Sequence, residues 1–397
     1  MKALHVIPSL ALGHGGPSFA MPLMERALAM ANVEVTVATT DDDGPLRHAA
    51  VPLEQRVRSN ASNRYYFRKQ SEFYKCSLPL LLWLTKHVRD YDLVHIHALF
   101  SFASVAAAWC ARRQRVPYII RPLGVLDRYG RTRRRAFLKS LSLRWIERPL
   151  LRDAAAVHYT SARERSEARE VVATARGVVV PLGIDLSPFQ NMPGPQRFRQ
   201  SWPETLGRNV VLFLSRIDPK KGVDLLLQAF ARVREHRPSA LLVIAGNGDD
   251  SYIEAMRDRA ARLGIAQDVL WCGFLDGADK LSALAAASVF VLPSYSENFG
   301  IAAVEALAAG LPCVLSRDVA VSDDVAASNA GLVVPPQPAP VAAALVRFLS
   351  DDALRAGCGI NARHLAASRF SLDAMGAGLL AAYRGVLNRG AHRPGTH

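Results

Sequence analysis

Two glutamates eight positions apart, Glu297 and Glu305, are the first candidates for chemistry in this chain. Glu297 lies in a polar turn that follows a short apolar run at 288–292. Glu305 lies inside an apolar segment at 300–309, and this composition predicts a buried helix. A carboxylate inside such a helix needs a partner or a ligand, because burial of an unpaired charge costs several kcal/mol.

The main-chain amides between the two glutamates add a second function to this stretch. The amides of Asn298, Phe299 and Gly300 lie at the start of the predicted helix, where unpaired N–H groups favour an anion. The carboxylates can bind hydroxyl groups and the amides can bind a phosphate. The stretch therefore predicts a site for a sugar nucleotide.

Arg216 and Lys221 form a second candidate group. They lie in the segment 215–224, between a predicted strand at 209–214 and a predicted helix at 223–234. A guanidinium donates forked hydrogen bonds, an ammonium is a point charge, and a helix start adds its dipole. Together they can neutralise a diphosphate without a metal ion.

Three strand ends in the first half carry further candidates. A glycine-rich loop with Gly15 and Gly16 follows a predicted strand at 2–7, and the absence of a G-x-G-x-x-G pattern argues against a dinucleotide fingerprint. His97 ends a predicted strand at 92–97, at the edge where open α/β sheets bind ligands. Arg121 ends the next one and can hold a phosphate, with an ordinary surface arginine as the alternative.

Strands and helices alternate along both halves, which predicts two doubly wound parallel sheets. Two segments do not fit this alternation. Residues 46–75 are polar with little periodicity and predict a mobile surface region, and Asp41–Asp43 predict a solvated turn in preference to a D-x-D metal site.

The spacing of Glu297 and Glu305 resembles the signature of glycosyltransferase family 4 (group 1), a family of retaining enzymes with the GT-B fold. The resemblance includes the flanking Pro293-Ser294 and Gly310-Leu311-Pro312. The segment 215–224 resembles the Arg…Lys-Gly motif of that family. The resemblance runs from residue 1 to about residue 388 and is strongest over 210–335.

The resemblance implies two Rossmann-like domains facing a central cleft, with the sugar donor held mainly by the second. The expected parts are an N-terminal acceptor-side domain (1–186), a linker (187–208), a C-terminal nucleotide-sugar domain (209–370), a helix crossing back to the first domain (371–388) and a disordered tail (389–397).

The resemblance also implies the reaction, which is transfer of a sugar from a nucleoside diphosphate sugar to an acceptor hydroxyl with retention. Glu297 would meet the sugar and Glu305 the ribose, and the departing phosphate would take the acceptor proton. Neither a metal nor another cofactor is expected. Many family members carry a histidine where this chain has Arg121. The remaining roles fall to Gly15 and Gly16 at the diphosphate, to Phe274 and Leu275 at the nucleobase (with a place in the core as the alternative), and to His97 and Arg121 in orienting donor and acceptor.

Positive charge is concentrated in the first half of the chain. Residues 1–190 hold 28 Lys and Arg against 16 Asp and Glu, whereas the whole chain has a net charge of +14. Within 128–152, nine basic residues accompany one acid and several large apolar residues, which is typical of a helix that contacts an anionic membrane surface. A surface helix packed on the core is the alternative.

The expected acceptor is a lipid-linked saccharide in bacterial surface polysaccharide assembly, such as lipopolysaccharide or exopolysaccharide. Five dispersed cysteines favour reduced thiols, and no apolar run is long enough to span a bilayer, so a cytoplasmic enzyme peripheral to the inner face of the membrane is expected. The alternatives are a sugar-nucleotide epimerase of the same fold and a basic membrane- or nucleic-acid-binding protein. Nucleic acid is disfavoured because the recognition motifs of such binders are absent.

Overall fold

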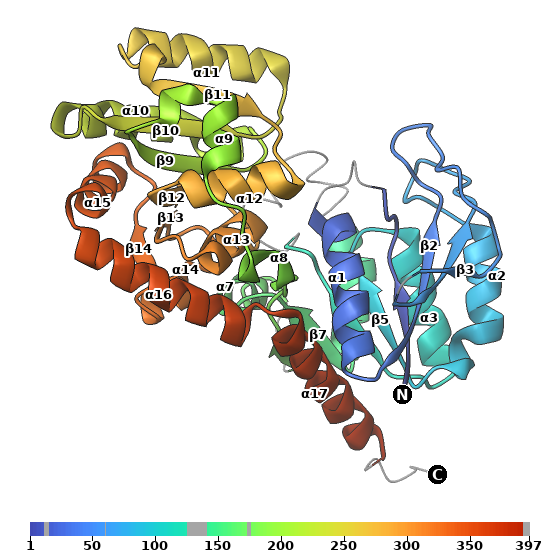
Figure 1. Ribbon diagram of the computed structural model, residues 1–397. Coiled ribbons are helices and arrows are strands. Elements are labelled where there is room, and N and C mark those ends of the chain that lie inside the picture. The colour runs from blue at the N-terminus through green and yellow to red at the C-terminus, as the bar shows by residue number, and fades with distance from the viewer. Residues whose placement is uncertain (12–15, 60, 125–140, 173–175, 392–397) are drawn as a thin grey trace. The chain divides into compact units, whose positions relative to one another are not determined.

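The computed structural model describes residues 1–11, 16–59, 61–124, 141–172 and 176–391 (Figure 1). The chain divides into two compact units. Unit 1 comprises Met1–Gly183 with Leu372–His397, and unit 2 comprises Ile184–Ser371. Each unit is an α/β layer structure built on its own sheet, and the expectation of two doubly wound parallel sheets is confirmed.

The sheet of unit 1 has the strand order β3-β4-β2-β1-β5-β6-β7-β8. Its neighbours pair in parallel except β3 and β4, which are antiparallel. The strands are β1 (Lys2–Val6), β2 (Glu34–Thr40), β3 (Val57–Arg58), β4 (Asn63–Phe67), β5 (Leu93–His97), β6 (Tyr118–Arg121), β7 (Ala156–Tyr159) and β8 (Gly177–Val179).

Helices cover the sheet of unit 1, so that its central strands are buried, with histidines and threonines among their apolar residues. The last helix of the chain packs against the first helix, so segments from both ends of the sequence belong to this unit. The helices are α1 (Gly16–Met30), α2 (Leu78–His87), α3 (Phe102–Arg113), α6 (Arg148–Asp153), α7 (Ala162–Arg169) and α17 (Leu372–Ala391), and a π-helical turn spans Leu143–Glu147.

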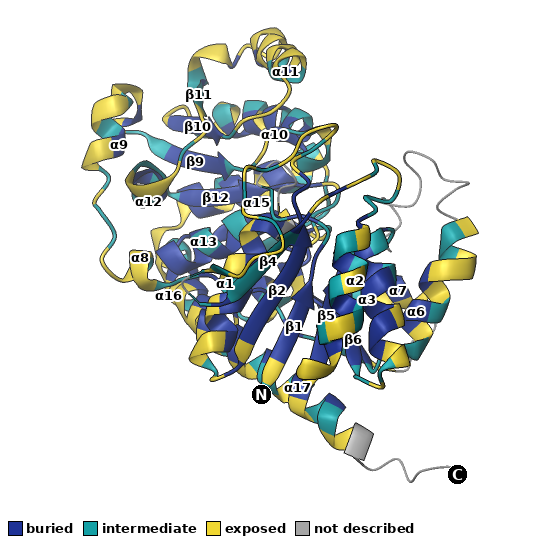
Figure 2. Ribbon diagram, turned by 90° about the vertical axis from the view of Figure 1, so that its right-hand side faces the viewer, coloured by how far each residue is buried: buried dark blue, intermediate teal, exposed yellow. Residues whose placement is uncertain are grey.

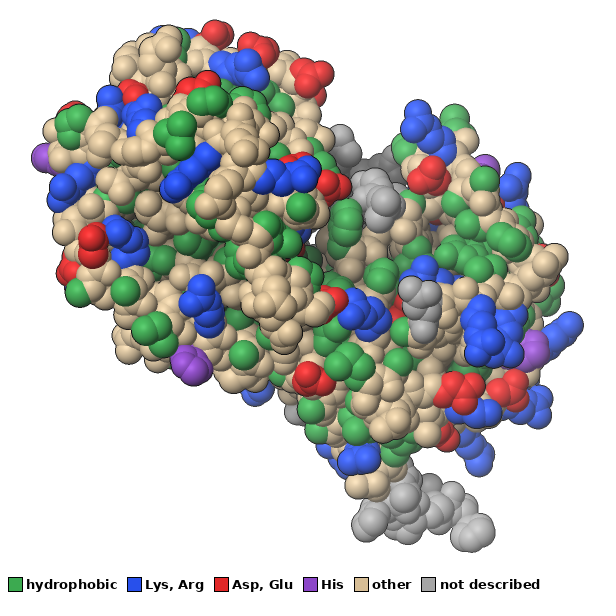
Figure 3. All heavy atoms as spheres, in the orientation of Figure 1, with side chains coloured by type: hydrophobic (Ala, Val, Ile, Leu, Met, Phe, Trp, Pro, Cys, Tyr) green, Lys and Arg blue, Asp and Glu red, His purple; other side chains and the backbone are tan. Residues whose placement is uncertain are grey.

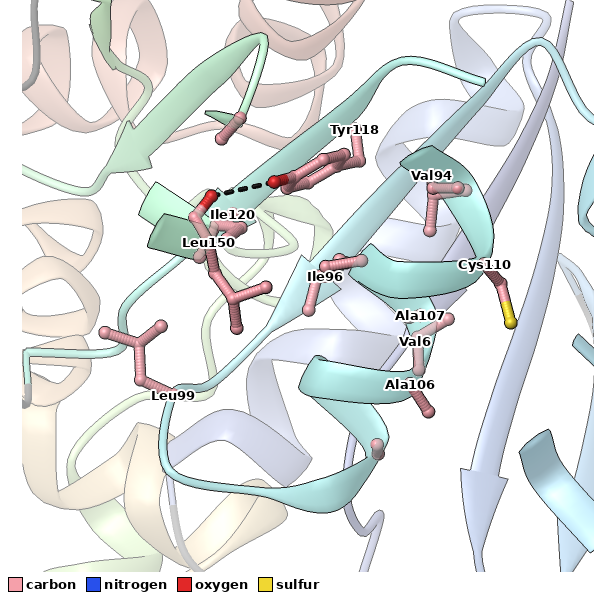
Figure 4. Close-up of a cluster of buried hydrophobic side chains, with 14 of the residues drawn as sticks. Val6, Val94, Ile96, Leu99, Ala106, Ala107, Cys110, Tyr118, Ile120 and Leu150 are labelled. Atoms are coloured by element: carbon pink, nitrogen blue, oxygen red, sulfur yellow. Dashed lines mark hydrogen bonds between the residues drawn. The ribbon is translucent and has the colours of Figure 1, made fainter. Parts of the chain in front are cut away.

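Figure 4 shows the core between α3 and the strands of unit 1. Apolar side chains of β5 and β6, among them Ile96 and Ile120, pack in this cluster with Ala107 from α3. The hydroxyl of Tyr118 donates to the carbonyl of Leu150 at 2.8 Å, so the buried phenol keeps a partner. Packing of this kind holds the carboxyl ends of β5 and β6 in fixed register.

Two expectations for unit 1 were wrong. The region 46–75 is no mobile surface segment, because it contains β3 and β4, and β4 pairs with β2 along its whole length. Asp41 and Asp42 are buried, and Asp42 accepts from the ammonium of Lys69 at 2.7 Å. The charged partners 27 residues away make burial of these carboxylates tolerable, and a local reading of the sequence cannot see them.

The sheet of unit 2 is entirely parallel, in the order β11-β10-β9-β12-β13-β14. Figure 2 shows its central strands as buried elements between helices. The strands are β9 (Asn209–Leu214), β10 (Ala240–Ala245), β11 (Val269–Gly273), β12 (Val289–Leu292), β13 (Cys313–Ser316) and β14 (Gly331–Val334). The longer helices are α10 (Val223–His236), α11 (Asp250–Arg262), α12 (Gly277–Ala286), α13 (Ile301–Ala309), α15 (Pro338–Ser350) and α16 (Asp352–Arg369). Short helices α8 (Ser187–Gln190), α9 (Gln196–Ser201) and α14 (Ser322–Ala327) complete the unit.

In each sheet the parallel strands are added first on one side of the first strand and then on its other side. In unit 1 the chain continues from β1 to β2 on one side and reaches β5 on the other side of β1. In unit 2 it continues from β9 to β10 and β11, and β12 then pairs on the other side of β9. Open α/β sheets bind ligands at the carboxyl ends of the strands where the strand order changes side in this way. The candidate site residues must therefore be sought after β1 and β5 and after β9 and β12.

Two further observations concern the surface charge of unit 1 and the hydropathy of the helices. Lys and Arg side chains are prominent on the face of unit 1 seen in Figure 3, with Asp and Glu side chains among them. Within the described residues, no helix combines the length and the apolar character that a bilayer span requires.

Candidate functional site

Two loops of unit 2 meet where the strand order changes side, between β9 and β12. The amide of Tyr295, in the loop after β12, donates to the carbonyl of Lys220 at 2.8 Å. Gly222 has a φ of +70°, and a Cβ there would lie 2.4 Å from the carbonyl oxygen of Pro293. Only glycine permits both this backbone conformation and this close approach. The two loops are therefore held together by their backbones.

The same contact brings two predicted site residues together. The ammonium of Lys221 forms an ion pair with the carboxylate of Glu297, and their side chains are only 12% and 16% exposed. The backbone of Glu297 is fixed on both sides, since its amide donates to Asp318 and its carbonyl accepts from Ala320, each at 3.0 Å. The arrangement places a cation and a carboxylate side by side at the carboxyl edge of the sheet.

The start of α13 lies in the same loop. The helix begins at Ile301, one residue later than expected, and Gly300 is its N-cap with a φ of +91°. Gly300 has no side chain with which to cap the first amides of the helix. Amides at a helix start attract an anion.

Glu305 has a partner that the sequence did not reveal. Lys280, on α12, donates to its carboxylate at 2.6 Å, and the two side chains are 25% and 17% exposed. The expected need of Glu305 for compensation is thereby met within the protein. The only signal in the sequence was that a buried carboxylate needs a partner. Nothing in the local sequence around Glu305 points to a lysine 25 residues away.

Replacing Lys280 with Met is expected to lower the free energy of unfolding by about 1–2 kcal/mol, since it leaves a half-buried carboxylate unpaired. A double-mutant cycle with Glu305→Gln, followed by urea unfolding, should give a coupling energy of about 1 kcal/mol. The matched control is the neighbouring pair of Arg197 and Asp279, whose side chains are 60% and 47% exposed. Its coupling should be a few tenths of a kcal/mol at most. Equal couplings would contradict the assignment.

Three other predicted residues of unit 2 lie at strand ends. In the described part of the chain, none of them forms a hydrogen bond or an ion pair with Lys221 or Glu297. Arg216 follows β9 and is exposed. Phe274 follows β11 and is 64% exposed, so the alternative of a core position does not apply to it. Leu275 is half-buried. An exposed aromatic ring at the carboxyl edge of a sheet is available for stacking.

In unit 1, the expected pair at the ends of β5 and β6 is in register. His97 and Arg121 are direct neighbours in the sheet, and they are 1% and 5% exposed. Burial lowers the pKa of Arg121 to about 10, with the negative charge of Glu164 acting in the opposite direction. The Nε of Arg121 is buried and has no partner in the described part of the chain. The alternative of a surface arginine is therefore wrong.

The glycine pair expected at the donor diphosphate is described only in part. Gly16 is the first residue of α1 and is exposed. Gly15 lies outside the described residues, as does the portion 125–140 that contains most of the basic segment.

The sequence also missed how many histidines gather behind His97. His5 and His95 lie beside it, and all three rings are buried. One ring nitrogen of each lies within 4.8 Å of the others, a spacing at which they could hold a metal ion. The same nitrogens, however, take part in hydrogen bonds within the protein.

Comparison with solved structures defines the class of the fold. The structure of Anabaena Alr3699/HepE in complex with UDP is 19% identical in sequence, with a TM-score of 0.77 over 97% of this chain and 100% of that chain. At this identity the likeness concerns the fold alone. Two parallel-sheet units with this likeness define a GT-B protein.

Sequence comparison gives the family. Residues 15–183 match the family described as "glycosyl transferase 4-like domain", and residues 195–365 match "glycosyl transferases group 1". The chain belongs to the group 1 glycosyltransferases, as the sequence motifs predict.

Two curated relatives show how far the likeness extends. A D-inositol 3-phosphate glycosyltransferase of Segniliparus rotundus is 35% identical over 226 residues, which are 54% of this chain and 48% of that protein. A phosphatidyl-myo-inositol mannosyltransferase of Mycolicibacterium smegmatis is 38% identical over 183 residues, 45% of each chain. The chain thus spans about half the length of the curated relatives it matches.

Proposed function

We propose that this protein transfers a sugar from a nucleoside diphosphate sugar to an acceptor hydroxyl, with retention at the anomeric carbon. The observation that carries the proposal is the Lys221–Glu297 pair beside the start of α13 with its glycine N-cap, at the change of side in the strand order of unit 2. A cation, a carboxylate and the amides of a helix start suit a group that combines negative phosphates with sugar hydroxyls.

In this proposal unit 2 holds the donor. Arg216, Lys221 and the amides of residues 298–300 stabilise the departing diphosphate, where the largest negative charge develops. No metal is required for this, because the protein supplies the positive charge. The UDP present in the HepE structure supports a nucleoside diphosphate as the ligand class.

The remaining residues of unit 2 recognise the rest of the donor. Glu297 accepts hydrogen bonds from hydroxyls of the transferred sugar, and Glu305, held by Lys280, accepts them from the ribose. Phe274 and Leu275 contact the nucleobase, and the exposed ring of Phe274 is available for that purpose.

The chemistry needs no protein base in this scheme. The bond between the anomeric carbon and the diphosphate oxygen breaks, a bond to the acceptor oxygen forms on the same face, and the departing phosphate takes the acceptor proton. Gly15, Gly16, His97 and Arg121 in unit 1 orient the donor diphosphate and the acceptor.

The proposed acceptor is a lipid-linked saccharide of bacterial surface polysaccharide assembly, reached at the inner face of the cytoplasmic membrane. The mannosyltransferase relative is named for phosphatidyl-myo-inositol, which is a lipid, and this supports a lipid-linked acceptor. In the described end of the basic segment 128–152, Leu141, Trp145 and Ile146 are exposed, so these apolar side chains do not all pack on the core. Apolar side chains among arginines favour peripheral contact with an anionic leaflet.

The test is thermal unfolding with a panel of nucleoside diphosphates and their sugars, each with and without magnesium. One nucleotide should stabilise the protein, by about 2.7 kcal/mol at a concentration of 100 Kd. The stabilisation should not depend on magnesium. It should disappear in Arg216→Ala and persist in Arg262→Ala, which removes an exposed arginine at the end of α11.

Product analysis separates this proposal from the epimerase alternative. With the matching sugar donor and an acceptor, the product should keep the anomeric configuration of the donor. Conversion of the donor to its epimer without any acceptor would contradict the proposal. So would the lack of stabilisation by every nucleotide in the panel.

A further inference from the structure

Five buried side chains of unit 1 form a polar cluster inside its apolar surroundings. They come from four elements: His5 from β1, His95 and His97 from β5, His158 from β7 and Tyr383 from α17. None is more than 1% exposed. A buried imidazole needs partners for its nitrogens, and it exists in one of two neutral tautomers that the partners select.

One end of the cluster has a fixed polarity. Nε2 of His158 lies 2.9 Å from the carbonyl oxygen of Val180. A carbonyl can only accept, so His158 donates from Nε2 and its Nδ1 carries no proton. That Nδ1 lies 3.3 Å from Nε2 of His95, which must therefore be the donor. Nδ1 of His95 is then bare and accepts from the hydroxyl of Tyr383 at 2.7 Å.

The polarity continues through the tyrosine to the far end. The single proton of Tyr383 is used on His95, so its oxygen accepts from Nε2 of His5 at 3.1 Å. Nδ1 of His5 is then bare and accepts from Nε2 of His97 at 3.0 Å. Each of the four imidazole rings in this chain of hydrogen bonds carries its proton on Nε2. Nδ1 of His97 is bare, and it is the one ring nitrogen of the cluster without a recorded partner in the described part of the chain.

The surroundings keep these rings neutral. Burial is the main cause that lowers the pKa of His5 and His158 to about 3 and lowers the pKa of His95 and His97 as well, and the positive charge of Arg121 acts in the same direction on all four rings. A doubly protonated ring could not accept, so neutrality is what an unbroken chain of this kind requires.

We propose that this chain of hydrogen bonds fixes His97 as a pure acceptor, whose bare Nδ1 receives a hydrogen bond from a substrate hydroxyl at the carboxyl edge of the unit 1 sheet. His5, His95, His158 and Tyr383 are positioning residues that act through His97. The substrate contact rests on the proposed function, whereas the tautomers rest on the hydrogen bonds alone.

A metal ion is the competing use of the same rings. Imidazole nitrogens suit Zn²⁺, and the spacing of His5, His95 and His97 permits it. The charged group whose field reaches all four rings is, however, the cation Arg121. A divalent ion there would be repelled by the guanidinium, and it would displace protons that already have partners. The arrangement therefore favours hydrogen bonding over metal binding.

The test reads the ring nitrogens directly, by long-range proton–nitrogen NMR correlation on the full chain labelled with ¹⁵N-histidine at pH 7.5. All four rings should be neutral with the proton on Nε2. In Tyr383→Phe, His95 and His158 should keep this form because the carbonyl of Val180 still directs them. His5 and His97 should switch to the Nδ1–H form, because the N–H without a protein acceptor then moves from Nε2 of His5 to Nδ1 of His97 at the carboxyl edge of the sheet, where water or a substrate hydroxyl can accept from it.

The matched control is Tyr118→Phe, which removes the same hydroxyl from a buried tyrosine of the same unit, outside the cluster. It should leave all four tautomers unchanged. Tyr383→Phe should also lower kcat for sugar transfer about tenfold with little change in the KM of the donor, while Tyr118→Phe should not.

Several outcomes would overturn the inference. The proposed chain of hydrogen bonds is wrong if any of the four rings of the unaltered protein is doubly protonated or carries its proton on Nδ1. It is also wrong if elemental analysis finds a stoichiometric metal. The substrate contact is wrong if Tyr383→Phe switches His97 and transfer stays at its full rate. Failure of the proposed function looks different, since the unaltered protein would then show the expected tautomers and no transfer with any donor.

Discussion

Replacing Lys221 with Met is expected to lower kcat/KM for sugar transfer by about two to three orders of magnitude. The ammonium of Lys221 is paired with Glu297 in a site where both side chains are largely shielded from water. The substitution removes a cation from the place where diphosphate charge develops, and it leaves the carboxylate of Glu297 to repel that charge. Affinity for the nucleoside diphosphate alone should fall with the rate, and both can be measured on the purified protein.

The control is Lys220→Met, which removes the same charge from the preceding residue of the same turn. The backbone carbonyl of Lys220, which accepts from Tyr295, is retained in this variant. A double variant with Glu297→Gln should recover part of the diphosphate affinity that Lys221→Met loses, because the repelling carboxylate is gone. Equal losses in the two lysine variants would show that net charge, and not this pair, governs binding.

The chemical candidates of unit 2 could be predicted because they lie in short segments with strong local signals. Glu297 and the start of α13 follow a buried strand, and Lys221 precedes a helix, so the sequence places each at a strand end. Their contact with one another depends on strand order, which puts β9 beside β12. Local periodicity does not contain that order, and the resemblance to a family supplied it.

The sequence did not identify the partner of a residue where that partner lies far along the chain. Lys280 compensates Glu305 from a separate helix, and Lys69 compensates Asp42 from a segment that looked unstructured. β4, with the sequence Asn63-Arg64-Tyr65-Tyr66-Phe67, is polar at its start because Arg64 pairs with the buried Glu25 at 2.6 Å. Such pairings suppress the alternation on which strand prediction relies.

The buried histidines predict a strong dependence of unit 1 stability on acid. A ring that stays neutral in the folded state but has an ordinary pKa near 6.5 when unfolded binds its proton only on unfolding. Stability is therefore complete above pH 6.5 and is lost as the pH falls below that value, by up to about 1.4 kcal/mol per pH unit for each ring. Four rings behave in this way: His5, His95, His97 and His158.

One buried acid works in the opposite direction. Burial raises the pKa of Glu147 to about 7, so the folded state gains a proton between pH 7 and the ordinary value near 4.5, and acid stabilises it there. The net effect corresponds to three rings, or up to about 4 kcal/mol per pH unit between pH 6.5 and 4.5. Over these two pH units the loss amounts to up to about 8 kcal/mol, which is comparable with the whole stability of a typical domain.

Hydrogen exchange read by mass spectrometry can follow the two units separately in one sample. Between pH 7.5 and 5.5, the opening free energy of the β5 amides should fall steeply, after correction for the pH dependence of intrinsic exchange. That of the β9 amides in unit 2 should change much less and serves as the internal reference. His158→Gln should reduce the slope in unit 1 by about a quarter to a third, because one of the rings that drive it is gone. His364→Gln, at an exposed position of unit 2, should leave that slope unchanged. Parallel loss of protection in both units would show that acid acts on the protein as a whole and not through the buried rings.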